Sequence, residues 1–350
     1  RHNCFVYRTI DDLDALKQAS LNAKTGVVIG GGLLGLEADK ALRDLNLDTH
    51  VVEFAPRLMA VQIDDLGGKV LKAKIENLGV KVHTQKATSS IEAGTSSTHV
   101  MKFADGSELE TDIVLFSAGI RPRDELARQS GLAMGERGGI VINDYCQTSN
   151  VDIYAIGECA LWQSKIYGLV APGYDMARIA AKHVIDQQCN AFAGADMSTK
   201  LKLMGVDVAS VGDAHAMTPN ALSYFYADEA AMVYKKIVVN HDKTKLLGAV
   251  LVGCAQEYND LLQMMLNGLA LPECPESLIM PGFADAPSKS GGSGVDLLPD
   301  SATICSCNNV SKADICSAVA EGSTSLGALK KCTKAATACG GCAPLVTQVL

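Results

Sequence analysis

The sequence predicts an α/β chain of several domains, because three different patterns follow one another along its 350 residues. An apolar run, a glycine cluster and a helical pattern come first. Strand-like runs separated by turn residues follow between residues 201 and 266. Six of the twelve cysteines then fall within residues 305–350. A chain of this length can form two or three separate hydrophobic cores.

Composition and charge exclude several classes of protein. Apolar residues make up 48% and charged residues 20%, which is ordinary globular usage and unlike a disordered, collagen-like or coiled-coil chain. The net charge of −8 argues against a general nucleic-acid binder, which needs a basic face to neutralise phosphates. The longest strongly apolar stretch, Leu246–Ala255, is about half of the ~20 residues that cross a bilayer. We therefore expect neither nucleic acid nor membrane as a partner.

The first part of the chain is predicted to hold a βαβ unit. Residues 1–24 form an extended piece and a short helix, and the unit itself begins at Thr25. Hydrophobic periodicity and the turn residues between the runs indicate the elements. In chain order they are a helix over Asp11–Ser20, a strand at Val27–Ile29, a helix over Leu33–Leu42, a strand over Thr49–Phe54, a helix over Asp64–Leu78, a strand at Val80–His83, a hairpin of Val100–Phe103 with Glu108–Glu110, and a buried strand at Ile113–Phe116.

The later elements are shorter and more widely spaced. Short strands are predicted around Ile140–Ile142 and Ile153–Ile156, followed by a helix near Tyr174–Gln187. A small antiparallel sheet with a helix packed on it is predicted next. Its strands are Val206–Val211, Met232–Val239 and Leu246–Val252, and its helix is Glu257–Asn267. The stretch Pro281–Pro299, rich in Pro, Ser and Gly around Ser288–Gly294, is predicted to be a flexible linker.

The glycine cluster has the spacing G-x-G-x-x-G and lies between a predicted strand and a predicted helix, which is typical of a dinucleotide-binding turn. Gly30 permits the tight turn, Gly32 lets a pyrophosphate approach the backbone, and Gly35 allows close helix–strand packing. The helix N-terminus adds amide donors and a positive dipole end. The residues of the predicted site are Gly30, Gly32, Leu33, Leu34 and Gly35. A glycine-rich turn without a ligand is the alternative interpretation.

Glu53 ends the next predicted strand, 18 residues after Gly35. A carboxylate at this place is expected to accept hydrogen bonds from ribose hydroxyls and to repel a 2′-phosphate, so NADH is favoured over NADPH. Arg57 follows four residues later. It either softens this preference or is a solvated surface arginine, and the sequence favours the second interpretation.

The terminal cysteines form a C-x-C pair and a C-x-x-C pair separated by 31 residues, namely Cys305 with Cys307 and Cys339 with Cys342. Four thiolates at such spacing indicate either an iron–sulfur cluster or structural zinc. A set of disulfides is disfavoured, because nothing indicates an oxidising compartment. Cys316 and Cys332 lack partner spacing and are expected to pack as small core residues. Residues 303–350 resemble the bacterioferritin-associated-ferredoxin-like domain, which implies a 2Fe-2S cluster.

Four further segments resemble the flavin-binding half of the two-dinucleotide-fold reductases. The run Thr148–Glu158 is similar to the motif whose acid binds the ribityl chain of FAD, which implies roles for Gly157 and Glu158. The run Ser117–Pro122, with Gly119, resembles the crossover between the two cofactor domains. Ala171–Asp175 resembles the start of the helix that points at the flavin ring. Tyr7–Thr9 resembles the entry segment, which implies that Arg8 contacts the flavin diphosphate.

Such reductases carry two G-x-G-x-x-G units, and the sequence contains one. We therefore expect the first half of the flavin domain to precede Arg1. No Cys-x4-Cys redox pair is present, so nothing supports disulfide reductase activity, and the sequence identifies no general acid or base.

The order of these parts resembles the large subunit of assimilatory NAD(P)H-dependent nitrite reductases, with Cys339–Val346 as a specific segment. The resemblance implies a Rossmann-type two-dinucleotide-fold reductase with an incomplete flavin domain, a small α+β interface domain and a small helical 2Fe-2S domain. The expected boundaries are 1–24 for the end of the N-terminal flavin half and connector, 25–120 for the NAD domain, 121–195 for the C-terminal part of the FAD domain, 196–280 for the interface domain, 281–302 for the linker, and 303–350 for the cluster domain.

This resemblance implies that electrons pass from NADH through FAD to the 2Fe-2S cluster. They would continue to a downstream sirohaem and 4Fe-4S domain of the same polypeptide, where nitrite is reduced to ammonium in nitrate assimilation. A small reductase subunit is a further expected partner, and a cytoplasmic location is expected. Two alternatives remain within the enzymes: an electron-transfer subunit of assimilatory nitrate reductase, and an NADH-dependent rubredoxin or ferredoxin reductase with an appended cluster domain. A sensor of NADH or iron–sulfur status is the non-enzyme alternative.

Overall fold

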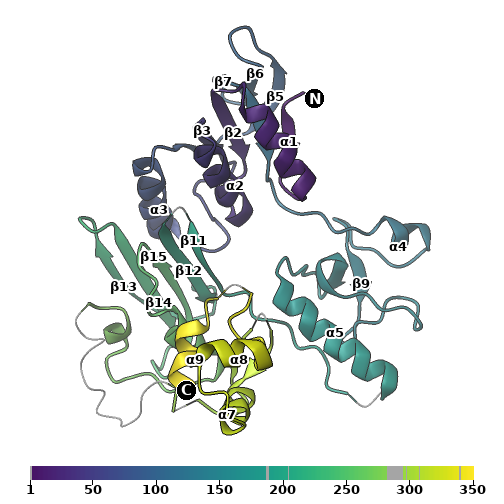
Figure 1. Ribbon diagram of the computed structural model, residues 1–350, viewed down its shortest axis with the longest axis vertical. Coiled ribbons are helices and arrows are strands. Elements are labelled where there is room, and N and C mark those ends of the chain that lie inside the picture. Colours follow the sequence, from purple (N-terminus) through teal and green to yellow (C-terminus); the bar gives the residue numbers. More distant parts are fainter. Residues whose placement is uncertain are drawn as a thin grey trace. The chain divides into compact units, whose positions relative to one another are not determined.

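A computed structural model describes residues 2–186, 189–203, 205–281, 295–296, 298–306, 308–338 and 340–350. These residues divide into two compact units, whose helices and strands are drawn in Figure 1. The first unit comprises Arg1–Gly119 and Ser198–Ala286, and the second comprises Ile120–Met197 and Pro287–Leu350. Within the described ranges, no helix combines the length and the apolar character needed to span a membrane.

A five-stranded parallel sheet carries the glycine cluster in the first unit. Its order is β1-β8-β2-β3-β4, and each neighbouring pair is parallel. Val27, Val28 and Val51 are fully buried, because both faces of the sheet are covered. The elements are β1 Cys4–Val6, α1 Ile10–Ser20, β2 Thr25–Ile29, α2 Leu33–Asp44, β3 Asp48–Val52, α3 Asp65–Asn77, β4 Lys81–His83 and β8 Ile113–Phe116. The predicted βαβ unit is confirmed.

Local capping explains where the helices of this unit begin. Thr9 and Asp12 form a capping box that starts α1. The Asp64 side chain accepts the Gly67 N–H and caps α3. Gly32 is the N-cap of α2 and offers no side-chain oxygen, so no side chain bonds to the first-turn amides of that helix.

A three-stranded antiparallel meander packs on one face of the parallel sheet. It consists of β5 Thr88–Ala93, β6 His99–Phe103 and β7 Glu108–Thr111. Met101 and Phe103 of the meander pack with Val27 and Val114 of the sheet. The predicted hairpin is therefore confirmed. Strand β5 was not predicted from the sequence, because Thr88, Ser89 and Ser90 at its start lack an alternating apolar pattern.

An antiparallel sheet completes the first unit. Its order is β11-β12-β15-β14-β13, with β11 Thr199–Leu203, β12 Val206–Gly212, β13 Leu222–Asp228, β14 Val233–Val239 and β15 Leu246–Val252. Side chains along β12 point to the two faces of the sheet. Val206 and Val208 lie in a core shared with α3, whereas Ala209 and Val211 pack with α6, Tyr258–Leu266. The predicted sheet with one packed helix is confirmed, and β11 and β13 are additional strands at its edges.

Residues 120–197 in the second unit form a small α/β layer. Its elements are α4 Glu125–Gln129, β9 Ile140–Ile142, the 3-10 turn η1 Gly157–Cys159, β10 Ala160–Trp162 and α5 Val170–Ile185. The prediction of a strand over Ile153–Ile156 is wrong: Tyr154 makes an isolated bridge to Gln147, and β10 pairs with β9 instead. Trp162 and Tyr167 are buried against Phe192, so the segment between β10 and α5 packs onto a hydrophobic core.

Residues 295–350 of the same unit form a helical subdomain with a short hairpin. The elements are β16 Thr303–Cys305, β17 Val310–Ser311, α7 Lys312–Ala320, α8 Leu326–Thr333 and α9 Ala343–Val349. Ser311 and Asp314 form a capping box that starts α7. The Ser325 side chain accepts the Ala328 N–H and caps α8. Val295, Leu298 and Ala302 are buried, and the predicted linker segment Ser288–Gly294 lies outside the described residues.

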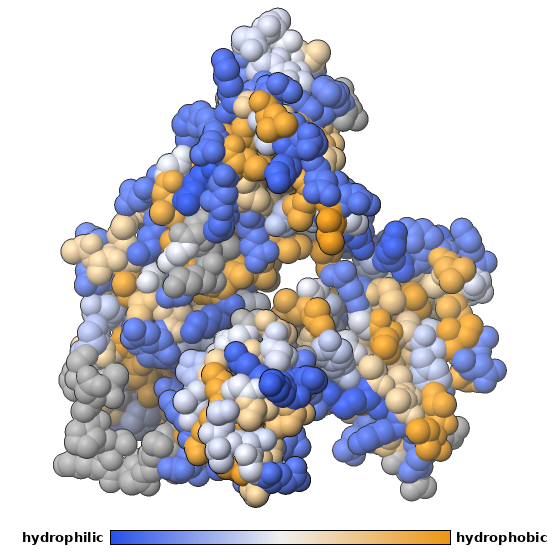
Figure 2. All heavy atoms as spheres, in the orientation of Figure 1, coloured by the Kyte–Doolittle hydropathy of each residue, from blue (hydrophilic) through white to orange (hydrophobic). Residues whose placement is uncertain are grey.

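The surface mixes polar and apolar residues. Figure 2 shows apolar residues in small groups among hydrophilic ones on the face that it draws. Phe54 and Val61 are 77% and 80% exposed, and both lie in the segment between β3 and α3.

Candidate functional site

The glycine-rich turn connects β2 to α2, and two of its glycines are required by sterics. Gly30 has a φ of 115°, and a Cβ there would lie 2.3 Å from the Ser117 carbonyl oxygen. A Cβ on Gly35 would lie 1.9 Å from the Gly30 carbonyl oxygen. A Cβ on Gly32, by contrast, would meet no described heavy atom within 4 Å. The turn is therefore closely packed at Gly30 and Gly35 and open at Gly32. The open backbone at Gly32 fits the approach of a pyrophosphate.

The Glu53 carboxylate lies directly beside this turn. Its Oε2 accepts the Gly31 N–H at 2.6 Å, and its Oε1 accepts the Ala55 N–H at 2.7 Å. The structure thus brings together the glycines and the acid that the sequence predicted as one site. Leu33 is half-buried and Leu34 is 49% exposed at the start of α2. A carboxylate, a row of uncapped amides and open space fit the ribose and diphosphate of a dinucleotide.

Arg57 is not the solvated arginine that the sequence favoured. Its Nη1 lies 2.6 Å from the Asp65 carboxylate, and its Nε donates to the Ile63 carbonyl oxygen at 2.9 Å. The Arg57 guanidinium therefore holds the middle of the segment between β3 and α3 against its end. A sequence pattern does not reveal this role, because the partners lie six and eight residues away, one in the irregular segment and the other at the start of α3.

The residues assigned to a flavin site lie in both units. Arg8 and Gly119 are exposed in the first unit, and Gly119 has a φ of 90°. In the second unit, Gly157 and Glu158 form η1 beside the start of α5. A Cβ on Gly173 would lie 3.4 Å from the Gly157 Cα, so α5 begins directly against this turn. No side chain caps α5, whose N-terminal turn contains Pro172.

Two of the described cysteines of the terminal subdomain, Cys305 and Cys342, lie next to each other. Cys305 is 2% exposed at the end of β16, and Cys342 is the N-cap of α9. The Cys342 thiol and backbone groups of Ala336 and Asn308 hold the pKa of the Cys305 thiol well below its usual range, although burial opposes this. The Asn308 amide nitrogen also lies 4.0 Å from the Cys305 sulfur.

These donors around a buried sulfur favour its thiolate, which is the form that ligates iron. Cys305 and Cys342 therefore fit a cluster site. Cys307 and Cys339 lie outside the described residues. The expectation that Cys316 and Cys332 pack in the core is wrong, because both thiols are exposed.

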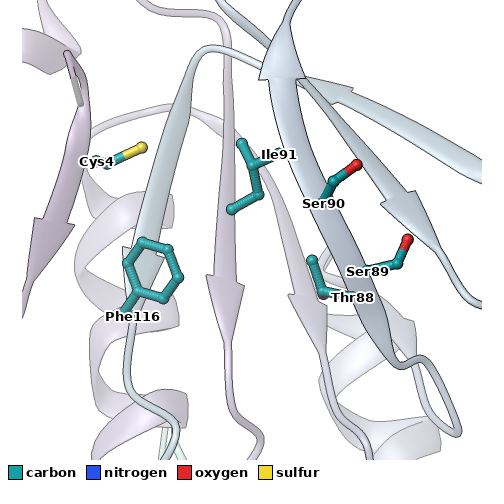
Figure 3. Close-up of a pocket in the computed structure, with 6 residues that line it drawn as sticks. All are labelled: Cys4, Thr88, Ser89, Ser90, Ile91 and Phe116. Atoms are coloured by element: carbon teal, nitrogen blue, oxygen red, sulfur yellow. The ribbon is translucent and has the colours of Figure 1, made fainter.

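A pocket that the sequence did not indicate lies between the parallel sheet and the meander (Figure 3). Its volume is about 540 Å³, and it is lined by Cys4, Thr88, Ser89, Ser90, Ile91 and Phe116. The Cys4 sulfur is 3.7 Å from His99 Nε2, and that nitrogen is 2.8 Å from the His2 carbonyl oxygen. No residue of the predicted dinucleotide site is among these lining residues.

Comparison with models of protein families shows to which family the chain belongs. Residues 1–217 match the model for pyridine nucleotide-disulphide oxidoreductases. The chain belongs to the pyridine nucleotide-disulphide oxidoreductase family. Two further models match this family member: the rubredoxin NAD+ reductase C-terminal domain over residues 198–269, and the BFD-like [2Fe-2S] binding domain over residues 303–350. Together these memberships imply NAD(P)H and FAD as cofactors of the reductase part and a 2Fe-2S cluster in the terminal part.

Curated relatives of this oxidoreductase match almost its whole length. It is 57% identical over 349 residues to the nitrite reductase (NADH) large subunit of Escherichia coli K12, covering 99% of the chain and 41% of that protein. It is 36% identical over 347 residues to the assimilatory nitrate reductase electron transfer subunit of Bacillus subtilis 168, covering 99% and 43%. The predicted resemblance to nitrite reductase large subunits is confirmed, and the chain spans about two fifths of these relatives.

Solved structures agree with the Rossmann-type fold class. A ferredoxin reductase from Rhodopseudomonas palustris has a TM-score of 0.67 at 24% identity, covering 80% of this chain and 68% of that one. The NAD-dependent persulfide reductase of A. fulgidus has a TM-score of 0.66 at 23% identity, covering 77% and 53%. The predicted fold class is therefore confirmed.

Proposed function

We propose that this chain is the electron-input portion of an NAD(P)H-dependent nitrite reductase large subunit. One observation carries the proposal: Glu53 is held against the open glycine turn in a chain whose terminal subdomain brings Cys305 and Cys342 together. The similarity to nitrite reductase large subunits over 99% of the chain supports the same activity. When bound, FAD supplies hydride acceptance and the 2Fe-2S cluster supplies one-electron transfer.

In this proposal, the chain's own residues bind and orient NADH, FAD and the 2Fe-2S cluster. The open backbone at Gly32 and the amides of α2 hold the pyrophosphate, with Gly30 and Gly35 shaping the turn and Leu33 and Leu34 beside it. Glu53 accepts the ribose hydroxyls and disfavours a 2′-phosphate, which selects NADH. Arg8, Gly119, Gly157 and Glu158 contact FAD. Cys305, Cys307, Cys339 and Cys342 ligate the cluster. No side chain is assigned as a general acid or base.

The remaining parts of the proposal concern the longer protein. Nitrite is reduced at a sirohaem and 4Fe-4S domain beyond this chain, with a small subunit as a further partner. We place the protein in the cytoplasm, and we keep the domain boundaries predicted from the sequence. The 36% identity to a nitrate reductase electron-transfer subunit makes that role the second candidate.

The test uses the full-length polypeptide, reconstituted with its cofactors. We expect NADH-dependent reduction of ferricyanide, and nitrite-dependent NADH oxidation with formation of ammonium. Ferricyanide reduction without nitrite turnover would support the second candidate or a rubredoxin or ferredoxin reductase. Absence of both reactions in flavin-replete protein would support a sensor.

Replacing Glu53 with alanine tests the NADH preference. We expect the KM for NADH to rise about tenfold with little change in kcat, because the ribose hydroxyls lose their acceptor. The KM for NADPH should not rise, because the repulsion of its 2′-phosphate is removed. Steady-state kinetics with both coenzymes measure this, and an unchanged KM for NADH would contradict the assignment.

A matched pair of glycine variants separates folding from coenzyme binding. Gly32→Ala should leave the melting temperature unchanged, because φ is −84° there and the Cβ meets open space, but it should weaken NADH binding at least tenfold. Gly30→Ala should destabilise the fold by roughly 2–4 kcal/mol, because a positive φ and a backbone clash act together. Thermal melting and NADH titration measure both effects. Equal losses of stability in the two variants would refute the assigned roles.

A further inference from the structure

The segment from Glu53 to Asp64, here called the ribose loop, is fastened to the glycine turn from one side. The Met59 N–H donates to the Gly31 carbonyl oxygen at 2.8 Å. Leu58 and Ile63 are fully buried, and a Cβ on Gly31 would lie 2.5 Å from a Leu58 methyl carbon. The position of Glu53 at the turn therefore depends on how the whole loop is held.

The other side of the ribose loop is held by β14 of the antiparallel sheet and by the segment between β12 and β13. Asp64 Oδ2 accepts the Tyr234 hydroxyl at 2.8 Å and the Lys236 ammonium at 3.1 Å. His215 Nε2 lies 2.8 Å from the Val61 carbonyl oxygen, so it donates there. These three contacts reach the end of the loop opposite to Glu53.

The Lys236 contact couples the sheet strongly to the loop. Lys236 is 6% exposed, and a buried ammonium is costly unless it is fully partnered. Its Nζ has two oxygen partners, Asp64 and the Ala214 carbonyl at 3.1 Å. Tyr234 is 1% exposed and packs in the core shared with α3. Displacing Asp64 would leave a buried charge and a buried hydroxyl without that acceptor, so the sheet resists movement of the loop.

We propose that the antiparallel sheet is part of the coenzyme site: Tyr234 and Lys236, through Asp64, and His215, through Val61, are positioning residues that preorganise the ribose loop for NADH. The inference rests on the proposed function and deepens it. A loop that is already ordered loses less entropy when the ribose binds to Glu53, so the sheet contributes to NADH affinity without touching NADH.

The chain provides a matched control on the same strand. Lys235 is 5% exposed and forms an ion pair with Glu257 beside α6, on the opposite face of β14 from Tyr234 and Lys236. Removing either lysine breaks a buried ion pair of the sheet, but only Lys236 contacts the ribose loop. A general loosening of the sheet would therefore affect both variants alike.

The test measures NADH-dependent ferricyanide reduction by the full-length protein and its Tyr234→Phe, Lys236→Met, Lys236→Arg and Lys235→Met variants. We expect Tyr234→Phe and Lys236→Met to raise the KM for NADH about threefold to tenfold, with kcat changed less than about twofold. Lys236→Arg should restore most of the affinity. Lys235→Met should lower the melting temperature as much as Lys236→Met but leave the KM at its wild-type value.

Two results would overturn the inference. One is an unchanged KM in both Tyr234→Phe and Lys236→Met, and the other is an equal rise in KM for Lys235→Met. Tyr234→Phe removes a single oxygen and keeps the ring packed, so it tests the inference even where Lys236→Met fails to fold. A wild-type protein that does not oxidise NADH would refute the proposed function instead, so the two failures are distinguishable.

Discussion

Replacing Cys342 with serine in the full-length protein should abolish the 2Fe-2S cluster. Cys342 lies against the buried Cys305 sulfur, and a serine hydroxyl is a poor substitute for a thiolate ligand of iron. We expect the wild-type protein to hold about two iron atoms per chain in addition to those of the proposed downstream sirohaem and 4Fe-4S domain, with an absorbance that bleaches on reduction. The variant should lose these two iron atoms and the nitrite turnover, while reduction of the flavin by NADH continues.

Cys316→Ser is the matched control, because Cys316 lies in the same subdomain with an exposed thiol. It should keep the iron content, the absorbance and the nitrite turnover of the wild type. Stoichiometric zinc in place of these two iron atoms would overturn the cluster, and a Cys342→Ser variant with the iron content of the wild type would remove Cys342 from its ligands.

Replacing Asp39 with alanine should stabilise the first unit, and more so at alkaline pH. Asp39 is fully buried in α2, and neither carboxylate oxygen has a hydrogen-bond partner among the described residues. Burial raises the pKa of this carboxyl from 3.8 to about 7, with a small opposing contribution from Arg43. The unfolded chain ionises freely above about pH 4, whereas the folded chain must either hold a proton or bury a charge.

The free energy of unfolding should therefore fall as pH rises from about 4 to 7 in the wild type. Removing the carboxyl should stabilise the unit by about 2 kcal/mol at pH 5 and by about 4 kcal/mol at pH 8. The only tryptophan, Trp162, lies in the other unit, so hydrogen exchange of β2 and α2 is the suitable measurement.

Asp44→Ala on the same helix is the control, because Asp44 is a half-exposed surface carboxylate paired with Lys40. It should change stability little at either pH. Destabilisation by Asp39→Ala at pH 8, or an equal effect at both pH values, would contradict the assigned burial penalty.

Short-range patterns explain which elements the sequence predicted well. The turn from Gly30 to Gly35 and the strands Val206–Val211 and Leu246–Val252 depend on residues close together in the chain. The cap of α8 is different, because Ser323, Thr324 and Ser325 are neighbours with similar capping ability. Only the structure shows that Ser325 caps this helix.

Short-range patterns could not predict contacts between residues that are distant in the sequence. Strands β11 and β13 carry weak patterns of their own and are completed by pairing at the sheet edges. The run Ile153–Ile156 is apolar enough for a strand, but β10 occupies the place beside β9. The pocket lined by Cys4 and Phe116 likewise joins strands that are far apart in sequence.

The sequence by itself determined the dinucleotide-binding unit, its acidic residue Glu53 and the cysteine spacing of the terminal subdomain, because each is a local constraint on backbone geometry or ligand chemistry. The tertiary structure alone decided what holds the far end of the ribose loop, at Asp64, in place. Asp64 and Lys236 are 172 residues apart, and their contact exists only because α3 packs between two sheets with a shared core. The burial of Asp39 was decided in the same way, since exposure depends on what covers a helix rather than on the helix itself.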